Sequence, residues 1–172
     1  VGDVQHRRHE RRRDRVAALH GKHARELLHQ SVGDALEEIA EIDPKPPHVL
    51  CESTGAARPW PLIAALTQDK RFQLRHFIVT VDALNLHRDF ADGRVLIGKA
   101  SVAGDPALQH AAGILAEQIF FASVIILTKT DTITRAVTDA QVRILRKLRP
   151  KATIALSVHG GLQLRQLNNT PP

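Results

Sequence analysis

Short apolar segments alternate with longer amphipathic segments over most of this chain, and no other feature constrains its fold as much. The short segments are rich in Val, Ile and Leu, and ten or more residues of helical spacing separate most of them. Parallel strands need crossovers of this length, usually built as helices. The alternation therefore predicts an α/β fold with three layers, in which helices flank a mostly parallel sheet.

Four strands and four helices are expected from the pattern. The strands are predicted over 48–53, 74–84, 123–131 and 151–158. The helices are predicted over 31–42, 61–68, 106–122 and 134–150. We expect the mixed, glycine-containing stretch 85–107 to be largely irregular.

Composition narrows the class of protein. A length of 172 residues suits one domain, and the single cysteine, Cys51, excludes an internal disulfide. No apolar run approaches the ~18 residues of a membrane helix, so we expect a cytoplasmic protein without a membrane partner.

The net charge is +6, and residues 1–29 carry eight Lys and Arg against four Asp and Glu. Such a segment is either a solvated terminus or an arm for nucleic acid. Because it has no aromatic residue to stack on bases, we do not expect nucleic acid as a partner.

Acidic residues follow three of the predicted strands. Glu52, Asp82 and Asp131 lie at or just past strand carboxyl ends, where parallel α/β sheets bind their ligands. The segment TKTD at 128–131 offers an Asp to the paired N–H donors of guanine, with the stem of Lys129 over the base. An ordinary strand-to-helix turn with a capping residue explains the same letters.

The segment ESTG at 52–55 also has two interpretations, one as a ligand site and one as an ordinary turn. Glu52 at a strand end is suited to Mg²⁺ or its water shell, and Gly55 lets a backbone N–H approach a phosphate closely. The alternative is a Glu that caps the next helix and a Gly that makes the turn. Neither segment decides the function alone.

Taken together, four segments resemble a known family. They are VLCESTGAARPWPLIAAL, FIVTVDAL, EQIFFASVIILTKTD and LRPKATIALSVHGGL, and in order and spacing they are similar to the CobW/HypB/UreG P-loop GTPases and metallochaperones, nearest the CobW branch. The resemblance runs from about residue 31 to about residue 162.

The resemblance implies roles for particular residues. It implies Mg²⁺ and γ-phosphate contacts for Glu52 and Gly55. It implies guanine recognition by Lys129 and Asp131, and it puts Thr128 and Ser157 among the nucleotide-binding residues. For Asp82, at the strand end that matches the VDA of the family, it implies a mainly structural role, with support of the neighbouring ligand residues as the alternative. The implied ligands are GTP and Mg²⁺, with zinc or cobalt as cargo for a metalloprotein client.

Two family features have no counterpart in these residues. The chain contains no G-x-x-G-x-G-K-T phosphate loop, so we expect an incomplete P-loop fold that lacks the first strand, and we assign no catalytic residue. Where the CobW branch has a C-x-C-C cluster, only His29 is able to ligate a metal. His20 and His23 nearby are expected to be solvated, so tight zinc or cobalt binding by this chain is not expected.

The expected organisation follows from this comparison. Residues 1–30 form a basic, poorly ordered or atypical segment, residues 31–165 a partial nucleotide-binding domain, and residues 166–172 a tail. We expect a GTP-binding protein that is associated with the handling of zinc or cobalt and that hydrolyses GTP very slowly or not at all. The alternative is a truncated, non-catalytic member that acts through protein contacts. A homodimer that covers the open sheet edge is a further expectation.

Overall fold

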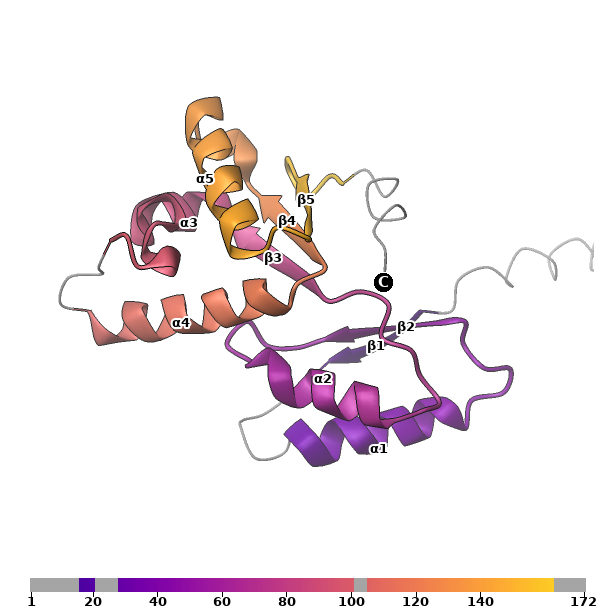
Figure 1. The fold of residues 1–172 in the computed structure, drawn as a ribbon. Helices are drawn as coiled ribbons and strands as arrows, with labels where there is room; N and C mark the ends of the chain where they lie inside the picture. Colours follow the sequence, from indigo (N-terminus) through magenta and orange to yellow (C-terminus); the bar gives the residue numbers. More distant parts are fainter. Residues whose placement is uncertain (1–15, 21–27, 101–104, 163–172) are drawn as a thin grey trace, which may run out of the picture. The chain divides into compact units, whose positions relative to one another are not determined.

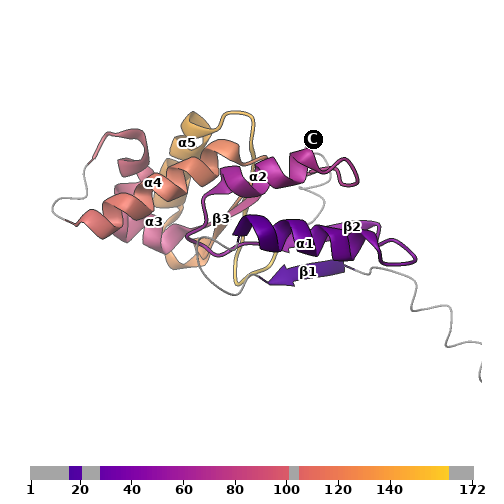
Figure 2. The ribbon, with the colours of Figure 1, turned by 90° about the horizontal axis from the view of Figure 1, so that it is seen from below.

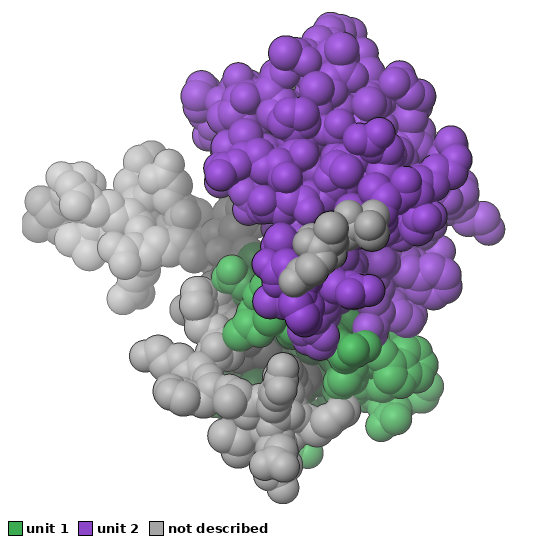
Figure 3. All heavy atoms as spheres, turned by 90° about the vertical axis from the view of Figure 1, so that its left-hand side faces the viewer, with its two compact units in different colours: residues 1–72 green, residues 73–172 purple. Residues whose placement is uncertain are grey.

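A computed structural model describes residues 16–20, 28–100 and 105–162, which Figures 1 and 2 show from two directions. The chain divides into two compact units, Val1–Phe72 and Gln73–Pro172, coloured separately in Figure 3. Of the predicted basic segment 1–30, residues 1–15 and 21–27 lie outside the described residues, as does the predicted tail 166–172. The domain boundaries at 30 and 165 stay predictions.

The first unit contains a two-stranded parallel ladder and two helices in its described part. Its elements are β1 (Val16–His20), α1 (Leu28–Ala40), β2 (His48–Glu52) and α2 (Pro59–Gln68). Val16 lies opposite His48 and His20 opposite Glu52, so both strands end at the same edge. The two helices contact each other, and Figure 1 shows them on the same side of the ladder.

Strand β1 was not predicted. Its sequence, VAALH, directly follows the Arg-rich run, within the segment 1–30 that was predicted to be basic and poorly ordered or atypical. The other three elements agree with the pattern. Helix α1 buries Leu36 and Ile39, and α2 starts with Pro59, whose missing N–H costs nothing in the first turn of a helix.

The second unit is built on a three-stranded parallel sheet of order β3-β4-β5. Its strands are β3 (Ile78–Asp82), β4 (Val124–Thr128) and β5 (Thr153–Leu156). Its helices are α3 (Ala83–Asp89), α4 (Pro106–Phe121) and α5 (Arg135–Leu148), with short 3₁₀ turns η3 (Ala91–Gly93), η4 (Val95–Ile97) and η5 (Thr130–Thr132). The α/β class with a parallel sheet and helices is thereby confirmed. All four predicted strands are present, although they belong to two ladders.

One face of this sheet forms the core of the second unit. Helix α5 contacts both α3 and α4, and side chains of all three helices pack in one core with alternate residues of β3 and β4. The buried core side chains from the strands and helices are Val79, Val81, Ile125, Leu127, Leu86, Phe90, Ile119 and Leu145. Burying each such side chain contributes about 1.5–3 kcal/mol, which makes the strand ends of this unit a firm support for a site.

The prediction that residues 85–107 are irregular was wrong in its first part. Helix α3 begins directly after β3, because Asp82 caps it: its Oδ1 accepts hydrogen bonds from the N–H groups of Leu84 (2.9 Å) and Asn85 (3.1 Å). Leu86 then faces the core and is 1% exposed. The helix is only seven residues long, so its apolar period was too short to recognise.

Candidate functional site

The carboxyl ends of β3 and β4 bring two polar side chains into register. Asp82 ends β3 and Thr128 ends β4, and the two residues pair across the ladder. The hydroxyl of Thr128 donates to the carbonyl oxygen of Val81 (3.2 Å), so it is used to hold the two strands together. The edge of the sheet that the sequence predicted as a ligand site is therefore the place where these groups gather.

Lys129, the first residue after β4, reaches back to the neighbouring strand. Its Nζ lies 2.6 Å from Oδ2 of Asp82, a charge-assisted hydrogen bond between residues 47 positions apart. Its backbone is left-handed, with φ 55° and ψ 33°. A residue other than Gly pays about 1–2 kcal/mol for that conformation, so the surrounding bonds have to hold it there.

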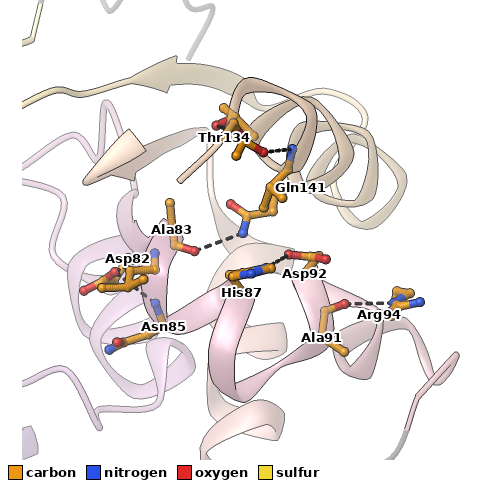
Figure 4. A network of polar contacts seen from close by, with 12 residues as sticks. Asp82, Ala83, Asn85, His87, Ala91, Asp92, Arg94, Thr134 and Gln141 are labelled. Carbon is orange, nitrogen blue, oxygen red and sulfur yellow. Dashed lines mark hydrogen bonds and ion pairs between the residues drawn. The ribbon is translucent and has the colours of Figure 1, made fainter. Parts of the chain in front are cut away.

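The pKa of Asp82 follows from this environment. Burial raises it, but the hydrogen bonds from Lys129 and from the N–H groups of Asn85 and Leu84, with the charge of Lys129, lower it further than burial raises it. The net pKa is below the ordinary value, so the carboxylate is ionised at neutral pH. Figure 4 shows Asp82 and Asn85 at the start of α3.

The rest of the turn is fixed by two sets of hydrogen bonds. Thr132 donates to the carbonyl oxygen of Lys129 from its N–H (3.0 Å) and its hydroxyl (2.7 Å). Thr130 donates to the carbonyl oxygen of Ser157 from its N–H (3.3 Å) and its hydroxyl (3.1 Å). Ser157 is 2% exposed and its N–H donates to Leu127 (2.8 Å), so β5 supports the turn through its backbone.

Asp131 lies in this turn with its carboxylate partly exposed. The nearest cationic partner is His159, whose Nδ1 is 3.6 Å from Oδ2 of Asp131. That distance is too long for a hydrogen bond, and the pair is ionic only when the imidazole is protonated. His159 itself is 82% exposed on the turn after β5. The carboxylate of Asp131 therefore lies partly exposed just beyond the carboxyl end of β4.

Helix α5, which follows the same turn, is fixed by a capping residue and by one long-range hydrogen bond. Thr134 caps it, its hydroxyl oxygen accepting from the N–H of Val137 (3.4 Å), and Gln141 donates from Nε2 to the carbonyl oxygen of Ala83 (2.9 Å). Gln141 is fully buried, and Figure 4 shows it pointing from α5 toward the start of α3. No sequence signal marked Gln141 or His159, because both act across elements far apart in the chain.

The segment 52–55 lies in the first unit, at the end of β2. Glu52 and Gly55 are both exposed, and the N–H of Ala57 donates to the carbonyl oxygen of Thr54 (2.9 Å) to close the turn. A Cβ added at Gly55 meets no heavy atom within 4 Å, which leaves open space beside its backbone. Burial raises the pKa of the Cys51 thiol in β2, so this cysteine is a partly buried apolar group and not a thiolate.

The predicted site residues thus fall in two groups. Within the second unit, the structure brings Thr128, Lys129, Asp131 and Ser157 to one edge of the sheet, with Asp82 beside them. Glu52 and Gly55 belong to the first unit.

Metal ligands are sparse in the part of the chain that is described. No cluster of three or more His, Cys, Asp or Glu side chains occurs there. His23 lies outside the described residues. The candidate site is therefore one of charged turns, without a preassembled metal centre in these ranges.

A parallel α/β sheet with charged turns beyond its strands places the protein in the class of α/β nucleotide-binding domains. The family model of the CobW/HypB/UreG nucleotide-binding domain matches residues 15–155, well over half of the chain, and the chain belongs to this family. The match begins directly before β1, so the strand that the sequence reading left out falls within the family domain. No solved structure matches the chain significantly.

Proposed function

We propose that this protein binds guanine nucleotides through the turn after β4. The observation that carries the proposal is the Asp131 carboxylate, partly exposed at the carboxyl edge of the sheet, in a turn held by Asp82 and Ser157. The family match, which names a nucleotide-binding domain, supports the class of ligand.

The chemistry of the base explains why guanine is the ligand of choice. Guanine presents its N1–H and its amino group side by side, and one carboxylate accepts both in a bidentate, charge-assisted pair. Adenine has no matching pair of donors. The stem of Lys129 supplies apolar surface for the base, while its ammonium donates to the carboxylate of Asp82. Thr128 and Ser157 act through the strands that carry the turn.

Mg²⁺ and the γ-phosphate are assigned to the turn after β2. Mg²⁺ prefers oxygen ligands and keeps several waters, so the exposed carboxylate of Glu52 at a strand end fits as one ligand or as a partner of the water shell. The open space beside Gly55 fits a close approach of phosphate to the backbone. Bound there, the ion neutralises phosphate charge.

The cellular role that we propose is GTP-dependent handling of zinc or cobalt for a metalloprotein client, in the cytoplasm. The resemblance to the metallochaperones of the CobW branch supports the metal part of this proposal, and the single cysteine fits a reducing compartment. Because the described residues hold no cluster of metal ligands, the cargo ion is a transient substrate in this proposal. These 172 residues contain no G-x-x-G-x-G-K-T segment, so we expect absent or very slow hydrolysis from them. No helix in the described ranges is long and apolar enough to cross a membrane.

The test is a titration with fluorescent GTP and Mg²⁺, competed by GTP and by ATP. Asp131→Asn exchanges the carboxylate for an amide and should weaken binding by about 10-fold or more, since a hydrogen bond to a charged group contributes about 1.5–3 kcal/mol. The matched control is Asp139→Asn on α5, an exposed carboxylate 3.9 Å from Arg135, which should leave binding unchanged.

Three results contradict the proposal. These are no binding by a chain shown to be folded, equal displacement by ATP and GTP, and unchanged affinity in Asp131→Asn. Absence of binding by the folded chain favours the second candidate, a non-catalytic family member that acts through protein contacts.

A further inference from the structure

Asp82 makes more contacts than the capping of a helix requires. Its Oδ1 alone accepts both N–H groups of the cap, from Leu84 and Asn85. Its Oδ2 is separate and accepts from Nζ of Lys129 at 2.6 Å. Asn caps helices as well as Asp does, so capping alone does not need a carboxylate. The second oxygen and the charge therefore serve Lys129.

Lys129 is the residue on the turn that most needs an anchor. Its left-handed backbone is unfavourable outside Gly, and its side chain has four rotatable bonds that an unpaired ammonium leaves free. Two partners oppose this: Thr132 bonds its carbonyl oxygen, and Asp82 bonds its ammonium. Together they fix both ends of the residue before any ligand arrives.

We propose that Asp82 is a positioning residue of the guanine site, which aims the stem of Lys129 across the place of the base by holding its ammonium. This inference rests on the proposed function. It assigns a specific role to a residue at the end of β3, a strand that carries none of the base-reading residues. Asp82 ends β3, a strand that pairs with β4 and contributes Val79 and Val81 to the core. The sheet therefore holds Asp82, and through it the ammonium of Lys129, in place.

Binding of guanine then costs less side-chain freedom than in a chain with a mobile lysine. Ordering one long side chain at a binding site corresponds to a loss of about 3- to 10-fold in affinity. Asp82→Asn retains the capping oxygen and removes the negative charge, so it isolates the second role. We expect it to weaken fluorescent GTP binding by about 3- to 10-fold, with far-UV circular dichroism and thermal midpoint close to wild type.

A double-mutant cycle separates positioning from a general structural effect. Lys129→Met keeps an unbranched apolar stem and removes the ammonium that Asp82 holds. If Asp82 acts through Lys129, Asp82→Asn has no further effect in the Lys129→Met background, and the double variant binds as the single Lys129→Met variant does. If Asp82→Asn fails to fold, Asp82→Ser, which also caps, takes its place in the cycle.

The outcomes keep the two levels of the proposal apart. Wild-type binding with an unchanged Asp82→Asn affinity overturns the positioning role and leaves guanine binding in place. So does a double variant whose loss equals the product of the two single losses. A folded wild-type chain that binds no guanine nucleotide overturns the proposed function itself, and the positioning role with it.

Discussion

The turns after β2 and β4 both follow a parallel strand and both carry predicted ligand residues, yet they are built differently. The turn after β4 is tied to β3 through Lys129 and Asp82 and to β5 through Thr130 and Ser157. In the turn after β2, the N–H of Ala57 donates to the carbonyl oxygen of Thr54 (2.9 Å). The comparison teaches that long-range bonds to β3 and β5 fix the turn after β4 to the sheet of its own unit.

The strands that carry these turns differ in how deeply their side chains are buried. In β4, Val124, Ile125 and Leu127 are 0% exposed, as expected for the central strand of a sheet. In β2, the residues alternate between exposed and partly buried, and Leu50 is 54% exposed. A turn is only as rigid as its support, so we expect the two regions to respond differently to substitution.

The largest expected effect compares two leucines at inner positions of these strands. Leu127→Ala opens a cavity in a closed core and should cost about 2–5 kcal/mol of unfolding free energy. Leu50→Ala removes an exposed side chain and should cost about 0.5 kcal/mol or less. Urea unfolding of each variant, followed by far-UV circular dichroism, measures both. Equal losses in the two variants would show that β2 is as well packed as β4.

A second, smaller contrast uses two glycines. Gly93 has φ +87°, and a Cβ there would lie 3.1 Å from Cγ2 of Ile144. Gly93→Ala should therefore cost about 1–2 kcal/mol from the left-handed backbone alone, and the close contact adds to this. Gly55→Ala meets open space and should change stability by less than about 0.5 kcal/mol.

The same pair of variants also tests the assignment of the phosphate side. If Gly55 approaches the γ-phosphate, its alanine variant loses GTP affinity while its melting temperature stays at the wild-type value. Gly93→Ala should lose GTP binding only because part of the protein is unfolded. At temperatures where this variant is folded, its GTP affinity should equal that of the wild type. A Gly55→Ala variant with unchanged GTP binding contradicts the γ-phosphate role.

Much of the fold could be predicted from the sequence because the strands have a strong local signal. The run SVIILTKTD is rich enough in β-branched residues to identify β4. The helical spacing of apolar residues identifies α4 and α5 equally clearly. Two elements were missed because their signal is short. The five residues of β1 follow a charged run, and the seven of α3 depend on the cap that Asp82 provides.

The site could be predicted only in part, for a physical reason. Position relative to a strand end is a local property, so Lys129 and Asp131 were expected just beyond β4, where the structure has them. The pairing of Lys129 with Asp82 depends on which strands are neighbours and in which register. Asp82 and Lys129 are 47 positions apart, and the sequence between them does not specify that register; the same holds for Gln141 and Ala83, 58 positions apart.

The smallest expected effect is on acid stability, and it compares one carboxylate from each unit. Hydrogen bonds from Arg71 lower the pKa of Asp69, and the bonds and charge around Asp82 lower its pKa against burial. A lowered folded-state pKa means that the contribution to stability is present above the ordinary carboxyl pKa of about 3.9 and is lost as the pH falls through the folded value. For Asp82 we expect a loss of about 1 kcal/mol or less, because its partner Lys129 is more than half exposed.

The two carboxylates differ in what unfolding does to their partners. Arg71 is two residues from Asp69 and stays near it in the unfolded chain, whereas Lys129 is 47 residues from Asp82 and is lost. Asp82→Asn should therefore flatten the fall of unfolding free energy between about pH 5 and pH 2, and Asp69→Asn should leave its slope at the wild-type value. Urea unfolding at a series of pH values gives both slopes. If Asp69→Asn flattens the fall as much as Asp82→Asn does, separation along the sequence does not decide how much these two carboxylates contribute to stability.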